Sequence, residues 1–100
     1  LLMITSKQRA YLRPMANSME TILIVGKSGV STEVIKQADD ALTAREIFKG
    51  KVLETAEDGV REIAAILAEK TQADIVQIIG TKFVLYRKNN KEPKITLPKK

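Results

Sequence analysis

The stretch VGKSGVS, residues 25–31, contains the residue types best suited to binding a phosphate group. It follows the apolar run ETILIV and precedes an amphipathic segment, so it is predicted to join a strand to the N-terminal end of a helix. Glycines let the backbone approach an anion closely, and the first N–H groups of a helix have no partner within it. Lys27 adds a positive charge. The pattern therefore predicts an anion site.

Two kinds of phosphate site share these letters. The nucleotide-binding motif GxxxxGK[ST] needs a glycine five residues before Gly26, where this chain has Thr21, so nucleotide hydrolysis is not expected. The remaining interpretation is a GxxG loop, Gly26 to Gly29, that binds a phosphodiester backbone, as the GxxG loop of KH modules does. Such contacts carry no base information. The structural alternative is that the glycines only shape a turn and that Lys27 is a solvated lysine.

Composition argues against catalysis. The chain has no cysteine and no histidine, which removes disulfides, the usual soft metal ligands and the usual general base at neutral pH. The adjacent acids Asp39–Asp40 and Glu57–Asp58 diverge by about 100° if they lie on a helix, so neither pair converges on a substrate. We therefore predict no catalytic residue, no metal and no cofactor.

The charge is unevenly distributed along the chain. Its net value is +5, with about +2 in residues 1–45, −3 in residues 46–81 and +6 in residues 82–100. This pattern favours a polyanionic partner such as RNA, although a basic tail is also typical of a solubilising end. No apolar run approaches the ~20 residues that cross a bilayer, and LLMITSKQR lacks the apolar core of a secretory signal. We expect a cytoplasmic monomer without membrane contact.

Hydrophobic periodicity predicts seven elements in a single domain of residues 1–100, with flexible ends at 1–4 and 89–100. Asp58 is the expected cap of the third helix, Gly50 is expected to weaken or bulge the second strand, and Pro14 to end or kink the first helix. KITL is predicted to add an edge strand or to trail. The expected elements are a helix over 5–16 capped by Thr5 or Ser6, a strand over 20–25, a helix from Ser31 to about Arg45 and a strand over 46–54. A helix after Asp58 and two hairpin strands over 73–80 and 82–88 follow. The strand over 20–25 is expected to be covered on both faces or to lie in a sheet centre.

This order, α-β-α-β-α-β-β, predicts an α+β fold with two layers, in which the helices pack on a four-stranded sheet. Helical crossovers between the first three strands favour a parallel arrangement, and the closing hairpin makes the sheet mixed.

Further basic residues are candidates for an RNA-binding surface. Arg9 and Arg13 lie four residues apart and would share a helix face, while Lys36 lies about one turn into the second expected helix. Arg87 fits an RNA contact and a solvated edge charge equally well, and its neighbour Tyr86 is expected in the core. The complete set of predicted RNA-binding residues is Gly26, Lys27, Ser28, Gly29, Arg9, Arg13, Lys36, Lys82 and Arg87.

Several of these stretches together resemble a known family. SKQRAYLRPMA, VGKSGVS, ALTAREIFKGKV, VQIIGTKFVLYR and KITLP are similar to the CRM domain (chloroplast RNA splicing and ribosome maturation) in its stand-alone bacterial, YhbY-like form. The resemblance implies a fold similar to the C-terminal domain of bacterial translation initiation factor three. It also implies RNA binding through the GxxG loop and nearby basic surface, association with precursors of the large ribosomal subunit, and no enzymatic activity. Gly50 departs from the pattern, because a β-branched residue is expected there.

The sequence therefore favours an RNA-binding ribosome assembly factor. The alternative is an interaction module that contacts a protein of the ribosome or its precursors, without touching RNA, through acidic residues near the third helix: Glu57, Glu62 and Glu69.

Overall fold

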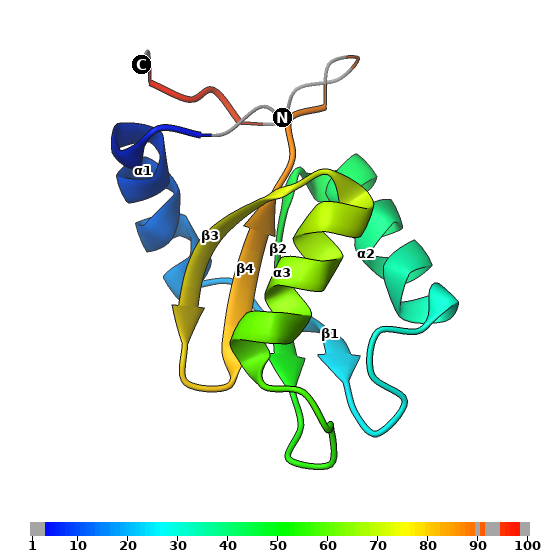
Figure 1. Ribbon diagram of the computed structural model, residues 1–100. Coiled ribbons are helices and arrows are strands. Elements are labelled where there is room, and N and C mark those ends of the chain that lie inside the picture. Colours follow the sequence, from blue (N-terminus) through cyan, green and yellow to red (C-terminus); the bar gives the residue numbers. More distant parts are fainter. Residues whose placement is uncertain (1–3, 90, 92–94, 99–100) are drawn as a thin grey trace.

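Three helices and four strands form the molecule, in the predicted order (Figure 1). The computed structural model describes residues 4–89, 91 and 95–98, so much of the predicted flexible ends lies outside the described residues. The elements are α1 (Ser6–Asn17), β1 (Thr21–Val25), α2 (Thr32–Arg45), β2 (Ile47–Val52), α3 (Val60–Thr71), β3 (Asp74–Ile79) and β4 (Lys82–Tyr86). The predicted mixed α+β class is confirmed.

The sheet is mixed, with strand order β1-β2-β4-β3. β1 runs parallel to β2, and β4 is antiparallel to both of its neighbours. The last hairpin thus inserts β4 between β2 and β3, leaving β1 and β3 as the two edges. The GxxG loop after β1, the loop after β2 and the turn at Gly80–Thr81 consequently share one end of the sheet (Figure 1).

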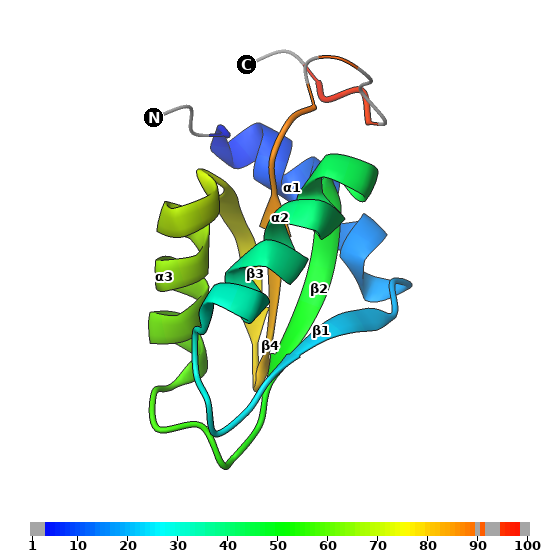
Figure 2. The same ribbon diagram turned by 90° about the vertical axis from the view of Figure 1, so that its right-hand side faces the viewer.

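Helices pack on the four-stranded sheet as predicted, but the prediction of two layers is wrong, because α1 lies on the face opposite to α2 and α3 (Figure 2). α2 lies over β1 and β2, and α3 lies over β2, β3 and β4. Between these two helices and the sheet is the larger core, which includes Val25, Leu42, Phe48, Ile63 and Phe83. Alternate residues of a strand point to opposite faces, so each central strand also supplies side chains to a second cluster.

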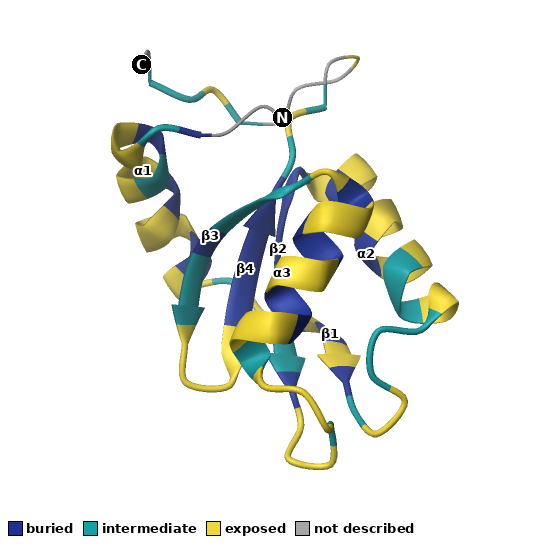
Figure 3. Ribbon diagram, in the orientation of Figure 1, coloured by how far each residue is buried: buried dark blue, intermediate teal, exposed yellow. Residues whose placement is uncertain are grey.

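The second cluster lies under α1 on the opposite face. Leu12 and Ala16 of α1 pack with Val76, Val84 and Tyr86. The expectation for Tyr86 is confirmed, since only 2% of its surface is exposed. Hydrophobic periodicity predicted this helix, but periodicity alone does not say which face of the sheet a helix meets. Figure 3 shows the resulting pattern of burial.

The helix ends correct two expectations. α1 begins with a capping box between Thr5 and Gln8 and continues past Pro14 to Asn17, so of the two expected effects of the proline, an end or a kink, the end is wrong. α3 begins after Gly59, which makes no side-chain cap bond, so Asp58 is not its cap. By contrast, Ser31 caps α2 as predicted, with its side-chain oxygen accepting from the N–H of Val34 at 3.2 Å.

The segment after β4 is held against the second cluster. The carboxylate of Glu46, a fully buried residue, accepts the N–H groups of Asn89 at 2.6 Å and Ile95 at 2.7 Å. Ile95 and Leu97 pack beside the cluster, and the carbonyl of Pro98 accepts from Gln8. The described residues 95–98 thus neither form a strand nor trail freely.

Two strands differ from expectation. The expectation that β1 is covered on both faces or lies in the sheet centre is wrong, because β1 is an edge strand. Ile22 and Ile24 are 40% and 58% exposed, since α1 covers β3 and β4 and does not reach this edge. β2 pairs with β4 without a bulge at Gly50. Register shifts lie instead in β1, between Thr21 and Leu23, and in β3, between Ile75 and Gln77.

Candidate nucleic-acid interface

The GxxG loop is a tight turn on the surface. The N–H of Gly29 donates to the carbonyl of Gly26 at 2.9 Å, closing a four-residue turn whose central residues, Lys27 and Ser28, are exposed. Gly29 has φ +63°, a left-handed conformation that favours glycine. No atom lies within 4 Å of a Cβ placed there, so its backbone is freely approachable. The turn uses the N–H of Gly29 internally, and this donor is therefore not available to an anion.

The donors left for a ligand belong to neighbouring residues. Ser31 receives the N–H groups of Val34 and Ile35 through its side chain and carbonyl. Within the described part of the chain, the N–H groups of Lys27, Ser28, Thr32 and Glu33 have no hydrogen-bond acceptor. The amides of Thr32 and Glu33 lie at the start of α2, where the helix dipole favours negative charge, and those of Lys27 and Ser28 lie in the loop that precedes it.

Lys27 is free of ion pairs with any described acid. The loop's other neighbour is the connection between β2 and α3, since a Cβ at Gly26 would lie 3.4 Å from Leu53 Cδ1 and 3.5 Å from Thr55 Oγ1. That connection also carries Glu54, Glu57 and Asp58. The acids on this side would therefore repel a polyanion bound at the GxxG loop, whereas the lysines of β2 and β4 would attract it.

Two other predicted residues lie at the same end of the sheet as the loop. Lys36 is exposed on α2 and forms an ion pair with Asp40, four residues on, at 3.1 Å. Lys82 begins β4, next to the turn whose Thr81 carbonyl accepts the N–H of Val52.

Arg9 lies toward the opposite end of the sheet. Its Nε donates to the carbonyl of Ile75 at 3.1 Å and its charge lies near Asp74. Burial raises the pKa of the Asp74 carboxyl, while a hydrogen bond from the Ile4 backbone and the charge of Arg9 act in the lowering direction. Arg9 thus helps to attach α1 to β3. Arg13, one turn further along α1, is exposed.

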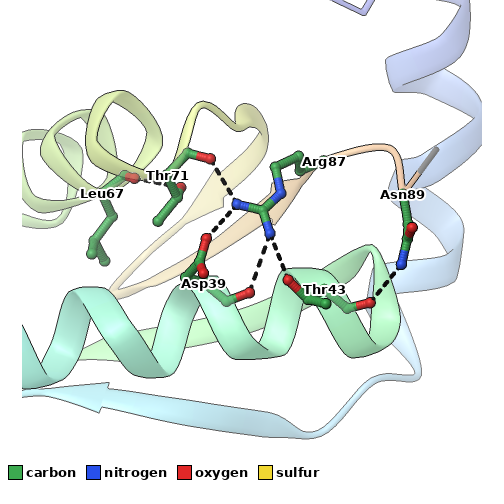
Figure 4. Close-up of polar contacts among 6 residues, drawn as sticks. All are labelled: Asp39, Thr43, Leu67, Thr71, Arg87 and Asn89. Carbon is green, nitrogen blue, oxygen red and sulfur yellow. Dashed lines mark hydrogen bonds and ion pairs between the residues drawn. The ribbon is translucent and has the colours of Figure 1, made fainter. Parts of the chain in front are cut away.

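Arg87 is part of the fold's own polar network (Figure 4). Its Nη1 donates to Asp39 Oδ1 at 2.6 Å and to the carbonyl of Thr71 at 2.9 Å, and its Nη2 donates to the carbonyl of Asp39 and the hydroxyl of Thr43. Only 24% of its side chain is exposed. These bonds connect β4 to α2 and α3, and they use the donors that an RNA contact of Arg87 would need.

The sequence did not single out Lys49 and Lys51. Both lie on β2 on the face that α1 covers only in part, and Lys51 is directly paired with Lys82. Their spacing of two residues could have indicated a shared face, but the cross-strand register that brings Lys82 beside them is a tertiary feature.

The described residues contain no group of acids that would hold a metal ion. None of the described helices is long and apolar enough to span a membrane.

Known proteins are similar to this chain over nearly its whole length. It is 38% identical over 96 residues to "Probable RNA-binding protein YqeI" of Bacillus subtilis, covering 96% of this chain and all of that protein. It is 31% identical to a protein of Haemophilus influenzae named "RNA-binding protein", with 97% of each chain covered. The solution structure of the hypothetical protein SAV1595 of Staphylococcus aureus, described as a candidate RNA-binding protein, matches with a TM-score of 0.80 and 40% identity, covering 95% of this chain and 99% of that one.

Residues 4–87, which include all seven elements and the GxxG loop, match the model of one domain family. The chain belongs to the CRS1 / YhbY (CRM) domain family.

Proposed function

We propose that this protein binds RNA and acts as an assembly factor on precursors of the large ribosomal subunit. It is a cytoplasmic monomer that works as a clamp and not as an enzyme. The observation that carries the proposal is the exposed GxxG loop, where Lys27 forms no ion pair with a described acid. The N–H groups of Lys27 and Ser28 in the loop, and of Thr32 and Glu33 at the start of α2, have no acceptor among the described residues. Support comes from relatives named as RNA-binding proteins and from a net charge of +5.

The loop holds the RNA backbone. Lys27 contributes charge and the amides of Lys27, Ser28, Thr32 and Glu33 donate to phosphate oxygens. Gly26 and Gly29 shape the turn and let the phosphate approach, while Lys36, Lys82 and the more distant Arg9 and Arg13 add attraction. Arg87 is left out because its guanidinium bonds within the fold.

The test is the double substitution Lys27→Asp and Ser28→Asp. Both side chains are exposed, so the melting temperature should stay nearly unchanged while affinity for precursor ribosomal RNA is lost. The matched control is Arg61→Asp with Ala65→Asp, which makes the same change in charge at two exposed positions of α3 that are not among the predicted RNA-binding residues. The control should keep most of the affinity. Full affinity in the folded loop variant would refute the clamp.

A protein contact through α3 is the second candidate. Ile66 is 38% exposed on this helix, which also carries the exposed acids Glu62 and Glu69, an arrangement that suits a basic partner with an apolar residue. Glu57 lies in the loop before α3. Co-purification with ribosomal particles that survives nuclease treatment and is lost with Ile66→Ser would favour this candidate.

A further inference from the structure

The open half of the sheet face under α1 carries a row of four side chains in direct register. Ile24 of β1 pairs with Lys51 of β2, Lys51 with Lys82 of β4, and Lys82 with Ile79 of β3. Directly paired residues point to the same face, so the row crosses all four strands, a span of roughly 14 Å at the usual strand spacing. Lys49 is two residues from Lys51 and faces the same way.

The lysines of this row are arranged at a cost to stability. Lys51 and Lys82 stand directly opposite each other on antiparallel strands, where like charges repel. Among the described residues no acid forms an ion pair with Lys49, Lys51 or Lys82. Three positive charges without a counter-charge on one patch create a local field that attracts an anion.

A shallow hollow adjoins the row at the C-terminal end of α1. Its lining combines lysines with two side-chain amides and apolar groups: Asn17, Lys49, Gln77, Ile79, Lys82 and Val84. Ile79 is 61% exposed and Ile24 is 58% exposed, so the surface beside the lysines is apolar and open to contact.

The charge favours RNA over a protein as the occupant. Lysine is depleted at the centre of protein–protein interfaces, whereas nucleic-acid interfaces are polar and strongly positive. The row also lies close to the GxxG loop, since Ile24 is two residues before Gly26. All four aromatic residues lie elsewhere: Tyr11 is on α1, and Phe48, Phe83 and Tyr86 are buried in the cores. Without a stacking platform, the contact is with the backbone.

We propose that the open face carrying Lys49, Lys51 and Lys82 is a second RNA-backbone contact, separate from the GxxG loop. It rests on the proposed function and extends it: a ribose-phosphate chain held at the loop continues across the row, with Ile24 and Ile79 against its sugars. The acidic connection after β2 disfavours the alternative path past Glu54.

The experiment compares two triple variants with equal loss of charge. Lys49→Gln/Lys51→Gln/Lys82→Gln, called the row variant, removes the two lysines of the row and the neighbouring Lys49. The matched control Arg61→Gln/Lys70→Gln/Lys88→Gln removes three exposed charges that lie on α3 and after β4. Binding of a fluorescein-labelled, mixed-sequence single-stranded RNA is titrated at several salt concentrations. The row variant should lose at least about tenfold in affinity, and its log–log salt slope should shrink by roughly 2, at about 0.7 for each phosphate contact on a single strand.

Folding is followed separately, because relief of the Lys51–Lys82 repulsion should leave the melting temperature of the row variant equal or higher.

Equal affinity of the row variant and its control, while Lys27→Asp/Ser28→Asp loses binding, overturns this inference and leaves the proposed function standing. Loss in the row variant with full binding by the loop variant would make the row the RNA contact in place of the loop, which refutes the loop clamp and overturns the row as a second contact. If the unmodified protein binds neither this RNA nor precursor ribosomal RNA, both are overturned. Retained RNA binding combined with lost affinity for poly-glutamate would assign the face to an acidic protein and also overturn the inference.

Discussion

Gly50 of β2 and Phe83 of β4 are directly paired, and the ring of Phe83 occupies the space where a side chain at position 50 would lie. A Cβ built on Gly50 would be 2.3 Å from Phe83 Cζ. Phe83 in turn packs edge-to-face on Phe48, with ring centroids 6.1 Å apart. The glycine that interrupts the apolar pattern of this strand therefore makes room for the aromatic pair at the centre of the larger core.

Gly50→Ala should lower the free energy of unfolding by about 1–3 kcal/mol, because the added methyl group overpacks the core. Urea denaturation measures the change. Gly59→Ala is the comparison, since a Cβ there meets no atom within 4 Å and only the smaller loss of a less favourable N-cap residue is expected. Adding Phe83→Leu to Gly50→Ala should recover part of the loss; if Gly50→Ala is as stable as the Gly59 control, the steric account fails.

Arg87→Gln should destabilise the protein by roughly 2 kcal/mol, because it breaks the bonds to Asp39, Thr43 and Thr71 that join β4 to both helices. Arg87→Lys should recover only part of this loss, since an ammonium lacks the planar fork. RNA affinity, measured well below the melting temperature, should be unchanged in both. A variant that keeps full stability but loses RNA would restore Arg87 to the RNA surface.

Asp40→Asn should increase RNA affinity, because it releases Lys36 from its ion pair. Both side chains are well exposed, at 76% for Lys36 and 65% for Asp40, so stability should change by no more than about 0.5 kcal/mol. The gain should disappear in the Lys36→Gln/Asp40→Asn double variant and at high salt. An equal gain in that double variant would mean that removal of the acid acts without Lys36.

Stability should fall as pH rises from about 10 to 12, because burial, with smaller effects from Glu46 and Asp74, raises the pKa of Tyr86 from 10.0 to about 12. Below pH 10 the phenol is neutral in both states. Between the two values it ionises only in the unfolded chain, which favours unfolding. In Tyr11→Phe, where Tyr86 is the remaining tyrosine, phenolate absorbance should therefore report a titration near pH 12.

The matched protein is Tyr11→Phe/Tyr86→Phe. The Tyr86 hydroxyl is buried without a hydrogen-bond partner in the described part of the chain, so its removal should not lower stability at neutral pH. The double variant should lose less stability over the alkaline range. Equal losses in the two proteins would show that Tyr86 is not the group responsible.

Local chemistry was enough to predict the elements that surround the GxxG loop. Ser31 is a favourable cap followed by a clear apolar stripe, and the closing hairpin has Gly80 at its turn with φ +59°. The features that the sequence could not supply depend on residues far apart in the chain. The sequence alone does not show that Arg87 pairs with Asp39, because Asp39 lies 48 residues earlier in the chain. The side of the sheet that α1 covers, the role of Gly50 and the opposition of Lys51 and Lys82 all require the strand register.

Ile4 and the described segment 95–98 both pack on the second cluster, where Gln8 bonds to Pro98. This is the end of the sheet where β2 begins, whereas the GxxG loop lies at the end where β1 and β2 finish (Figure 1). Polypeptide joined to either side of the domain would therefore enter and leave at one pole. Such a domain can be one of several in a longer chain, or carry a fusion partner, without obstructing the end of the sheet that carries the GxxG loop.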